Sequence, residues 1–462
     1  MDTLILFKQT FLFIQELKKL LQLAAPIAVS QLVQTANCFV DAFMSGQISA
    51  IDLASVALGS SIWLPIYLCI VGILMGATPI IARYHGENHL EKLPFITHQT
   101  LYLSGMIGLV GAIITYFSPC LLGYMSIKPE LIPITTRYLH AIAFGIPAVS
   151  FLTALNAFSE GLNNSKPIMF ISIISLIGNI PINYILMYGL FGFPALGGAG
   201  CGYTTSILAW LMCFMMMSLI HKSPLSHHAQ LFSRQYLPHA QSIKELLSIG
   251  LPIGLTIFLE ASIFCVIALF LGKQGVNVIA GHQVALNFSS LIFMIPLSIS
   301  MALTVRVSKA MGERCKTKTK VACLAGLSIN VIIAFFMAFS IYFLRFHIAA
   351  IYTDAEQVIK LSTELLTLAA IFQFSDGLQI AANGALRGFQ ETKSPMLMTL
   401  TGHWLVGLPI GYFLGEIGIS SPMGAQGFWI GLIIGLTTTA ILLLRKLRFC
   451  MQNFDNYLNH PT

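Results

Sequence analysis

The chain has 462 residues, of which 56% are apolar and only 9% are charged. Soluble globular proteins carry roughly 25% charged residues. A chain this poor in charge is therefore not a cytosolic enzyme and, despite its net charge of +7, not a nucleic-acid binder. Its apolar runs are long and continuous, and a helix that crosses a bilayer needs about 20 such residues. The composition predicts an all-α polytopic membrane protein.

In chain order, the first feature is a short apolar stretch, residues 4–14, followed by the charged residues Glu16, Lys18 and Lys19. It lacks a small-residue cleavage site, so an interfacial helix is expected rather than a cleavable signal. Apolar windows between polar or Gly/Pro breaks then predict twelve spans. They lie near residues 20–46, 53–82, 94–118, 131–159, 166–190, 196–220, 245–271, 279–305, 321–344, 356–386, 394–414 and 424–444.

The positions of Lys and Arg predict the orientation of these spans. With twelve spans, most of the 25 basic residues fall in segments on the same side as the N-terminus. The opposite side carries Lys128, Arg137, Lys273, Arg345 and Lys360. Cytoplasmic segments are enriched in Lys and Arg, so both termini are expected in the cytoplasm, with the protein in the cytoplasmic (inner) membrane. The net charge needs no acidic partner.

An internal repeat divides the chain into two similar halves. Short matches recur in the same order, among them Pro26 with Pro252, Val56-Ala57-Leu58 with Val284-Ala285-Leu286, and residues 161–167 with 388–395. The repeat covers six spans, so the two halves have the same orientation and are expected to be related by a pseudo-two-fold axis along the membrane normal. Parallel repeats of this kind are typical of transporters.

The repeat also sets the predicted domain limits. These are an N-terminal lobe at 1–220, a cytoplasmic linker at 221–244 and a C-terminal lobe at 245–462.

Three carboxylates fall well inside predicted spans: Asp41, Glu260 and Asp376. Each costs roughly 2.5–3.5 kcal/mol on insertion scales, and no Lys or Arg is expected at the same depth. A mobile positive partner would account for them. The alternative is a protonated carboxyl that is hydrogen-bonded to a neighbouring helix.

Polar side chains at helical spacing accompany these acids on one face of a helix. The stripes are Ser30, Gln34, Asn37 and Asp41; Ser172, Ser175, Asn179 and Asn183; Gln283 and Asn287; and Asp376, Gln379 and Asn383. Such stripes often hold helices together in lipid. Facing a carboxylate, they could instead supply oxygen ligands for a hard cation such as sodium.

Motifs for other chemistry are missing from the sequence. The nine cysteines are scattered without a CxxC, and there is no P-loop, GxSxG or HExxH motif. Histidines at 221, 227, 228 and 239 lie in the hydrophilic linker and are expected to be solvated there. No catalytic residue or cofactor is predicted, and the chain is not expected to be an enzyme.

Jointly, the motifs resemble the multidrug and toxic compound extrusion (MATE) family and, within it, the NorM-like branch. The resemblance covers nearly the whole chain. It rests on Pro26 with Asp41, Val56-Ala57-Leu58-Gly59, residues 161–167, Glu260, residues 282–287, and Asp376 with Leu386-Arg387-Gly388.

The resemblance implies antiport of cationic, lipophilic drugs and dyes out of the cell in exchange for sodium ions or protons. It associates Glu260 and Asp376 with sodium, and Asp41, Asn179 and Asn183 with sodium or proton coupling. Gln283 and Asn287 are added to this cation-coupling set. The residues assigned to substrate contact are Asp41, Gln34, Phe264, Phe293 and Gln379. Some relatives have a tyrosine near Phe293, whose hydroxyl this chain lacks.

We expect neutralisation of these carboxylates by the incoming ion to release the drug outward. The expected partners are small cationic drugs and membrane lipid, with no nucleic acid, and the protein is expected to be a monomer. The main rival is a flippase for lipid-linked sugars, which should hold a pyrophosphate with cationic residues inside its spans. An integral membrane enzyme would need an interfacial catalytic cluster. A channel would differ from a carrier in its flux rate.

Overall fold

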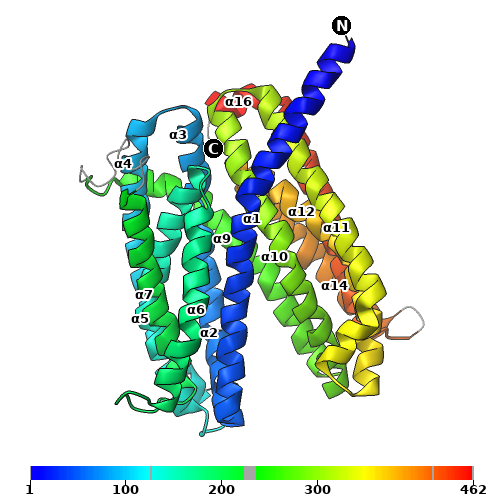
Figure 1. The fold of residues 1–462 in the computed structure, drawn as a ribbon. Coiled ribbons are helices and arrows are strands. Elements are labelled where there is room, and N and C mark those ends of the chain that lie inside the picture. Colours follow the sequence, from blue (N-terminus) through cyan, green and yellow to red (C-terminus); the bar gives the residue numbers. More distant parts are fainter. Residues whose placement is uncertain (1, 125–126, 223–235, 419–420, 460–462) are drawn as a thin grey trace. The chain divides into compact units, whose positions relative to one another are not determined.

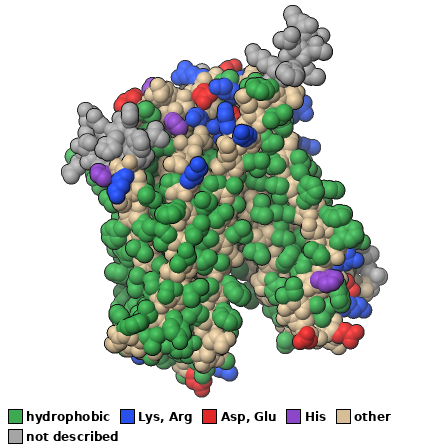
Figure 2. All heavy atoms as spheres, in the orientation of Figure 1, with side chains coloured by type: hydrophobic (Ala, Val, Ile, Leu, Met, Phe, Trp, Pro, Cys, Tyr) green, Lys and Arg blue, Asp and Glu red, His purple; other side chains and the backbone are tan. Residues whose placement is uncertain are grey.

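The computed structural model describes residues 2–124, 127–222, 236–418 and 421–459. Every regular element in these ranges is a helix (Figure 1). Twelve stretches are long and apolar enough to cross a membrane, and they overlap the twelve predicted spans one for one. Hydrophobic side chains cover the sides of the helices, whereas charged side chains gather near the helix ends (Figure 2). The prediction of an all-α polytopic membrane protein is confirmed.

Packing divides the chain into two units. The N-terminal unit is Val29–Gly254, and the C-terminal unit combines Met1–Ala28 with Leu255–Thr462. The lobe limits predicted from the sequence follow the membrane spans and stay a prediction. Most of the predicted linker, with His227 and His228, lies outside the described residues.

Two long helices belong to both units. Helix α1 (Asp2–Ile48) passes from the C-terminal to the N-terminal unit just after Pro26, and α9 (Ala240–Gly272) makes the opposite passage just after Pro252. These prolines are equivalent in the repeat. A proline inside a helix removes one backbone hydrogen bond and favours a bend, so each passage coincides with a locally weakened turn.

In the N-terminal unit, α5, α6 and α7 run side by side, and α2 and α4 pack against α5 (Figure 1). The helices are α2 (Ala50–Leu74), α3 (Ala77–Gly86), α4 (Leu93–Phe117), α5 (Ile132–Gly161), α6 (Lys166–Tyr188) and α7 (Ala199–Lys222). Helices α2 and α3 form one span that is interrupted at Met75 and Gly76. A Cβ atom on Gly76 would lie 2.7 Å from the backbone of Gly250, so this interruption sits at a close helix contact.

In the C-terminal unit, α12 contacts α10, α11 and α15. The helices are α10 (Val276–Gly312), α11 (Lys316–Tyr352), α12 (Glu356–Gly388), α13 (Lys393–Thr399), α14 (Leu408–Tyr412), α15 (Ala425–Gln452) and α16 (Phe454–Asn459). Two π-helical segments, η3 (Leu400–Gly407) and η4 (Phe413–Ile417), complete the eleventh span. This span packs on α15 through glycines, and a Cβ atom on Gly402 would collide with the Thr439 hydroxyl and the Gly435 carbonyl. Small residues permit such close approach in membranes.

The backbone repeats as the sequence does. Asn88 and Arg314, which have positive φ angles of 60° and 51°, hold equivalent positions in the two halves. Asn163 and Gln390, both with φ of 61°, form a second equivalent pair. Each of these residues lies two positions after the last residue of a helix, where a left-handed residue commonly ends a helix. The two halves therefore share their turn geometry as well as their motifs.

Candidate functional site

The first candidate centre surrounds Asp41 in the N-terminal unit. Asn183 Nδ2 donates to Asp41 Oδ1 at 2.7 Å, and Asn179 Nδ2 donates to the same oxygen at 3.1 Å. Thr205 Oγ1 lies 3.4 Å from Asp41 Oδ2. Helices α1, α6 and α7 thus meet at one carboxylate. Donors of this kind stabilise the ionised form of a carboxyl group.

The two asparagines form a rigid pair because they are one helical turn apart on α6. Asn183 Nδ2 also donates to Asn179 Oδ1 at 3.1 Å, and both side chains are at most 1% exposed. Asn183 Oδ1 is buried without a hydrogen-bond partner. A buried acceptor without a partner is costly, so this oxygen is available to a cation or a water molecule.

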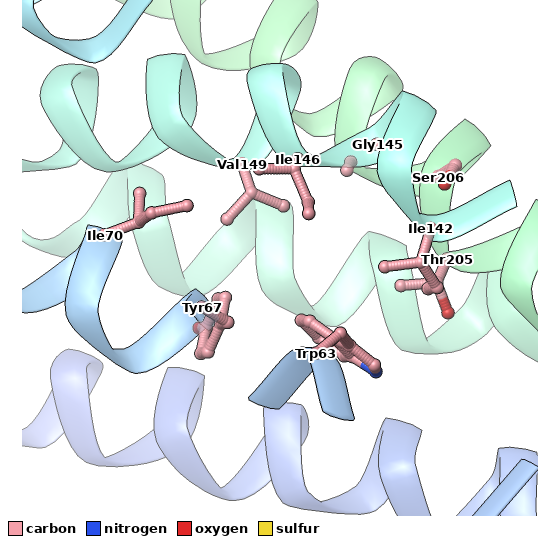
Figure 3. Close-up of a pocket in the computed structure, with 10 residues that line it drawn as sticks. Trp63, Tyr67, Ile70, Ile142, Gly145, Ile146, Val149, Thr205 and Ser206 are labelled. Carbon is pink, nitrogen blue, oxygen red and sulfur yellow. The ribbon is translucent and has the colours of Figure 1, made fainter. Parts of the chain in front are cut away.

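A pocket adjoins this centre between α2, α5 and α7 (Figure 3). Trp63, Tyr67 and Thr205 contribute to its lining. The rings of Trp63 and Tyr67 pack edge to face at 5.4 Å. The predicted Gln34 donates a hydrogen bond to the Tyr67 hydroxyl. Because Thr205 contacts both the pocket and Asp41, the aromatic pocket and the carboxylate belong to one site.

The second candidate centre lies in the C-terminal unit. Gln379 Nε2 of α12 donates to Glu260 Oε1 of α9 at 2.7 Å. Asp376, one turn before Gln379, is 7% exposed and interacts electrostatically with Glu260. In the described part of the chain, its carboxylate has no hydrogen-bond partner. Two acids that share one buried site repel each other when both are ionised.

None of the three predicted acids forms an ion pair with any described residue. One buried basic side chain nevertheless contributes to the electrostatics of Glu260: Arg387, which is 5% exposed. Its position beside Gly388 at a span end gave no sign of burial. That no Lys or Arg lies at the same depth as these acids stays a prediction.

Other predicted residues stand apart from these contacts. Gln283 and Phe293 are half-buried and Asn287 is exposed, and no hydrogen bond joins Gln283 or Asn287 to either acid within the described residues. Phe264 packs edge to face on Phe372, with ring centroids 6.4 Å apart. Their roles in cation coupling or substrate contact stay predictions.

Several polar residues of these regions were not predicted from the sequence. Thr205 of α7 belongs to none of the predicted polar stripes. Trp63 and Tyr67 are one turn apart on α2. Glu160, a further acid that is 7% exposed, lies in the last turn of α5 at the position equivalent to Arg387. The repeat itself was the signal that could have identified it.

The ligand types in the second centre suit a hard monovalent cation. Gln379 Oε1 is buried without a hydrogen-bond partner, beside the carboxylates of Glu260 and Asp376. Hard cations prefer such oxygen ligands. Elsewhere, a search of the described ranges finds no group of three or more His, Cys, Asp or Glu residues placed to hold a metal ion.

Comparison with known proteins identifies the family. The family model MatE matches residues 26–185 and again 252–413, so one model fits both halves of the chain and confirms the internal repeat. Among curated relatives, multidrug resistance protein PmpM of Pseudomonas aeruginosa is 44% identical over 95% of this chain and 92% of its own length. Multidrug resistance protein NorM of Photobacterium profundum is 40% identical over 96% of this chain and 97% of its own length.

Solved structures share the fold at lower identity. The eukaryotic MATE transporter AtDTX14 matches with a TM-score of 0.83 and 18% identity over 96% of this chain and 99% of its own. A MATE structure described as the straight conformation matches with a TM-score of 0.87 and 20% identity over 96% and 97%. The resemblance inferred from the motifs is thus confirmed. The chain belongs to the MATE family, whose members are membrane transporters and not enzymes.

Proposed function

We propose that this protein exports cationic, lipophilic compounds across the inner membrane in exchange for sodium ions or protons. Relatives with about 40% identity over nearly the whole chain are named multidrug resistance proteins. The observation that carries the proposal is that Asp41, Glu260 and Asp376 lie in membrane-spanning helices and form no ion pair with a described residue. Acids kept in a membrane without a fixed counter-ion favour travelling cations as partners.

The Asp41 centre suits the cationic substrate. Trp63 and Tyr67 offer aromatic faces for a flat, positively charged compound, and cation–π contacts contribute about 0.5–2 kcal/mol. Asp41 supplies the charge that such a compound needs, and it is connected to the pocket through Thr205. Apolar neighbours such as Ile142 and Val149 tolerate varied shapes because they make no directional bonds. This combination supports broad selectivity for lipophilic cations.

The Glu260 centre suits the coupling ion. Two carboxylates and the free Oε1 atom of Gln379 present oxygen ligands to sodium, and either acid can take a proton instead. Because neighbouring negative charges repel, a cation that neutralises one of them removes that repulsion. Binding of the coupling ion would thereby favour a different arrangement of α9 and α12 from that of the ion-free state.

The membrane potential supplies the driving force. One positive charge that moves inward across 100 mV contributes about 2.3 kcal/mol, and every 1.4 kcal/mol corresponds to a tenfold concentration ratio. One or two ions per cycle therefore sustain drug gradients of roughly 10- to 1000-fold, provided that the charge of the drug does not cancel the gain. The expected topology places both termini in the cytoplasm, and a monomer contains both centres.

Dye efflux tests the proposal. Membrane vesicles or cells that contain Asp41→Asn, Glu260→Gln or Asp376→Asn are compared with wild type in ethidium efflux, with sodium and pH gradients imposed separately. Each variant is expected to lose most of its ion-driven efflux, because the neutral side chain has no charge to exchange. A matched control is Glu356→Gln, which changes an exposed acid at the start of α12. Wild-type ion dependence in all three variants would disprove carboxylate coupling.

A further inference from the structure

Helix α12 carries a stripe of five buried polar residues that extends beyond the predicted cation site. Gln373, Asp376, Gln379, Asn383 and Arg387 are 1%, 7%, 2%, 1% and 5% exposed, respectively. They are three or four residues apart, so they lie on one face of the helix. At 1.5 Å per residue the stripe is about 21 Å long, which is about two-thirds of the hydrocarbon thickness of a bilayer.

The stripe is not the seam through which α12 packs on α10. That seam is formed by hydroxyl groups of α10 that donate to backbone carbonyls of α12. The pairs are Ser300 with Ile380 at 2.6 Å, Thr304 with Gly384 at 2.9 Å and Ser308 with Gly388 at 3.0 Å. These carbonyls follow the stripe residues by one position. The polar side chains of the stripe are therefore not needed for the α10 contact.

Several atoms of the stripe are buried without a hydrogen-bond partner. They are Gln373 Nε2, Gln379 Oε1 and Asn383 Nδ2. Buried polar groups nearly always have a partner in protein or ordered water. Three such atoms on one face of α12, both before and after Asp376, mark positions where a water molecule or an ion would satisfy a buried polar group.

Arg387 is the last residue of this stripe. Its side chain forms no hydrogen bond or ion pair in the described part of the chain, although it is almost fully buried. It lies two turns beyond Gln379, the residue that holds Glu260, and helical side chains lean toward the N-terminus. Arg387 therefore shares one face of α12 with Gln379, and its charge contributes to the electrostatics of Glu260. A basic residue in a last helical turn is favoured by the helix dipole, but that effect does not require burial.

We propose that Arg387 is a tethered counter-cation for Glu260, which competes with the coupling ion and thereby promotes its release. This inference rests on the proposed function, since it assigns the ion-release step of the same exchange. When the ion is bound, the two positive charges repel and the site binds the ion less tightly. When the ion has left, the guanidinium balances the charge of Glu260. Arg387 is thus a positioning residue and not a ligand of the ion.

Other titratable groups near this site are engaged elsewhere. His282 of α10 accepts a hydrogen bond from Trp429 Nε1 at 3.2 Å. His403, in the segment whose Trp404 donates to the Leu259 carbonyl, contacts Thr399 and Thr439. Among the described residues, Asp376 and Arg387 are therefore the charged groups that face Glu260.

Ethidium efflux from membrane vesicles tests the proposal, at a series of sodium concentrations and, in a second arm, of proton concentrations. In Arg387→Gln, the cation concentration that gives half-maximal efflux should fall about tenfold, because the unit charge of Arg387 no longer opposes binding. The maximal rate should fall as well, because release becomes slower. Arg387→Lys keeps the charge and should resemble wild type. Lys393→Gln removes an exposed charge at the start of α13 and is the matched control.

Thermal unfolding of purified protein in detergent gives a second, independent measurement. Arg387→Gln should unfold at a lower temperature than wild type, and the double variant Glu260→Gln, Arg387→Gln should recover part of that loss, since Glu260 then no longer leaves an unbalanced charge. This measurement tests whether Arg387 balances the charge of Glu260 even if Arg387→Gln transports too little dye to measure.

The proposal would be overturned if Arg387→Gln had the same half-maximal cation concentration as wild type. It would also be overturned if the double variant unfolded at no higher temperature than Arg387→Gln. Cation-independent efflux by wild type would instead disprove the proposed function, and the unfolding measurement would still test the pairing.

Discussion

Replacing Asn183 with alanine tests how the protein stabilises a charge in the membrane. Asn183 Nδ2 makes the shortest hydrogen bond to Asp41, at 2.7 Å, and its side chain is fully buried. The substitution leaves Asp41 with Asn179 at 3.1 Å and Thr205 at 3.4 Å. The ionised carboxylate becomes less stable, so a cation that neutralises it should bind more tightly.

The size of the effect follows from the contact that is lost. A hydrogen bond to a charged group contributes about 1.5–3 kcal/mol, and the distance to Asp41 is at the short end of the range for charge-assisted bonds. Since 1.4 kcal/mol corresponds to a factor of ten, cation affinity should rise roughly 10- to 100-fold. The maximal efflux rate should fall, because a tightly bound cation leaves slowly.

Efflux at increasing ethidium concentration measures both quantities, because Asp41 is the proposed site of the cationic compound. The matched control is Asn330→Ala in the other unit, which removes a fully buried amide that donates to the Gly326 carbonyl at 3.0 Å and forms no hydrogen bond with a carboxylate. This control should lower the unfolding temperature without moving the cation midpoint. If the midpoint in Asn183→Ala stays within twofold of wild type, the amide does not control the charge on Asp41, and the reasoning fails.

Three further substitutions test stability and substrate contact. Burial would raise the pKa of Glu391, but hydrogen bonds from Ser394 and the charge of Lys446 hold this pKa below its usual range. The ionised Glu391 carboxylate therefore stabilises the folded protein above about pH 4.3, and this stabilisation is lost as pH falls through the folded-state pKa. Glu391→Gln should accordingly lower the free energy of unfolding by roughly 1–3 kcal/mol at pH 7 and by little at pH 3, measured by unfolding in detergent. Gly384→Ala should cost about 1–3 kcal/mol and lower the unfolding temperature, since its Cβ atom would lie 2.5 Å from a backbone oxygen of α10. Trp63→Ala should weaken ethidium binding by about 0.5–2 kcal/mol, measured by fluorescence titration, whereas sodium binding should not change.

The sequence predicted the fold well because the membrane constrains it strongly. In hydrocarbon, every backbone polar group needs an internal partner, so a long apolar run must be a helix, and all twelve spans were found. The interruption at Gly76 and the π-helical segments η3 and η4 were not predicted. They depend on close contacts with Gly250 and with α15, and contacts between distant segments leave no mark on local hydropathy.

Part of the candidate site could also be predicted from the sequence. Helical spacing correctly grouped Asn179 with Asn183, because periodicity fixes which side chains share a face. It could not show that Asn183 would donate to Asp41, since that contact depends on how α6 packs against α1. Arg387 was missed for a different reason. A basic residue at a span end fits the positive-inside pattern, and the sequence alone does not reveal whether its side chain turns inward.

The two halves share one fold but balance their buried carboxylates in different ways. In the N-terminal unit, the protein itself satisfies Asp41 through amide and hydroxyl donors, so this charge persists without a bound ion. In the C-terminal unit, Asp376 has no hydrogen-bond partner among the described residues, and Glu260 has Gln379. That unit therefore depends more strongly on a cation to balance its charge. The equivalent ends of α5 and α12 also differ in charge, because α5 has the buried acid Glu160 where α12 has the buried base Arg387. A duplicated fold with unequal charges can bind two different cations, which is what an antiporter of drug and ion requires.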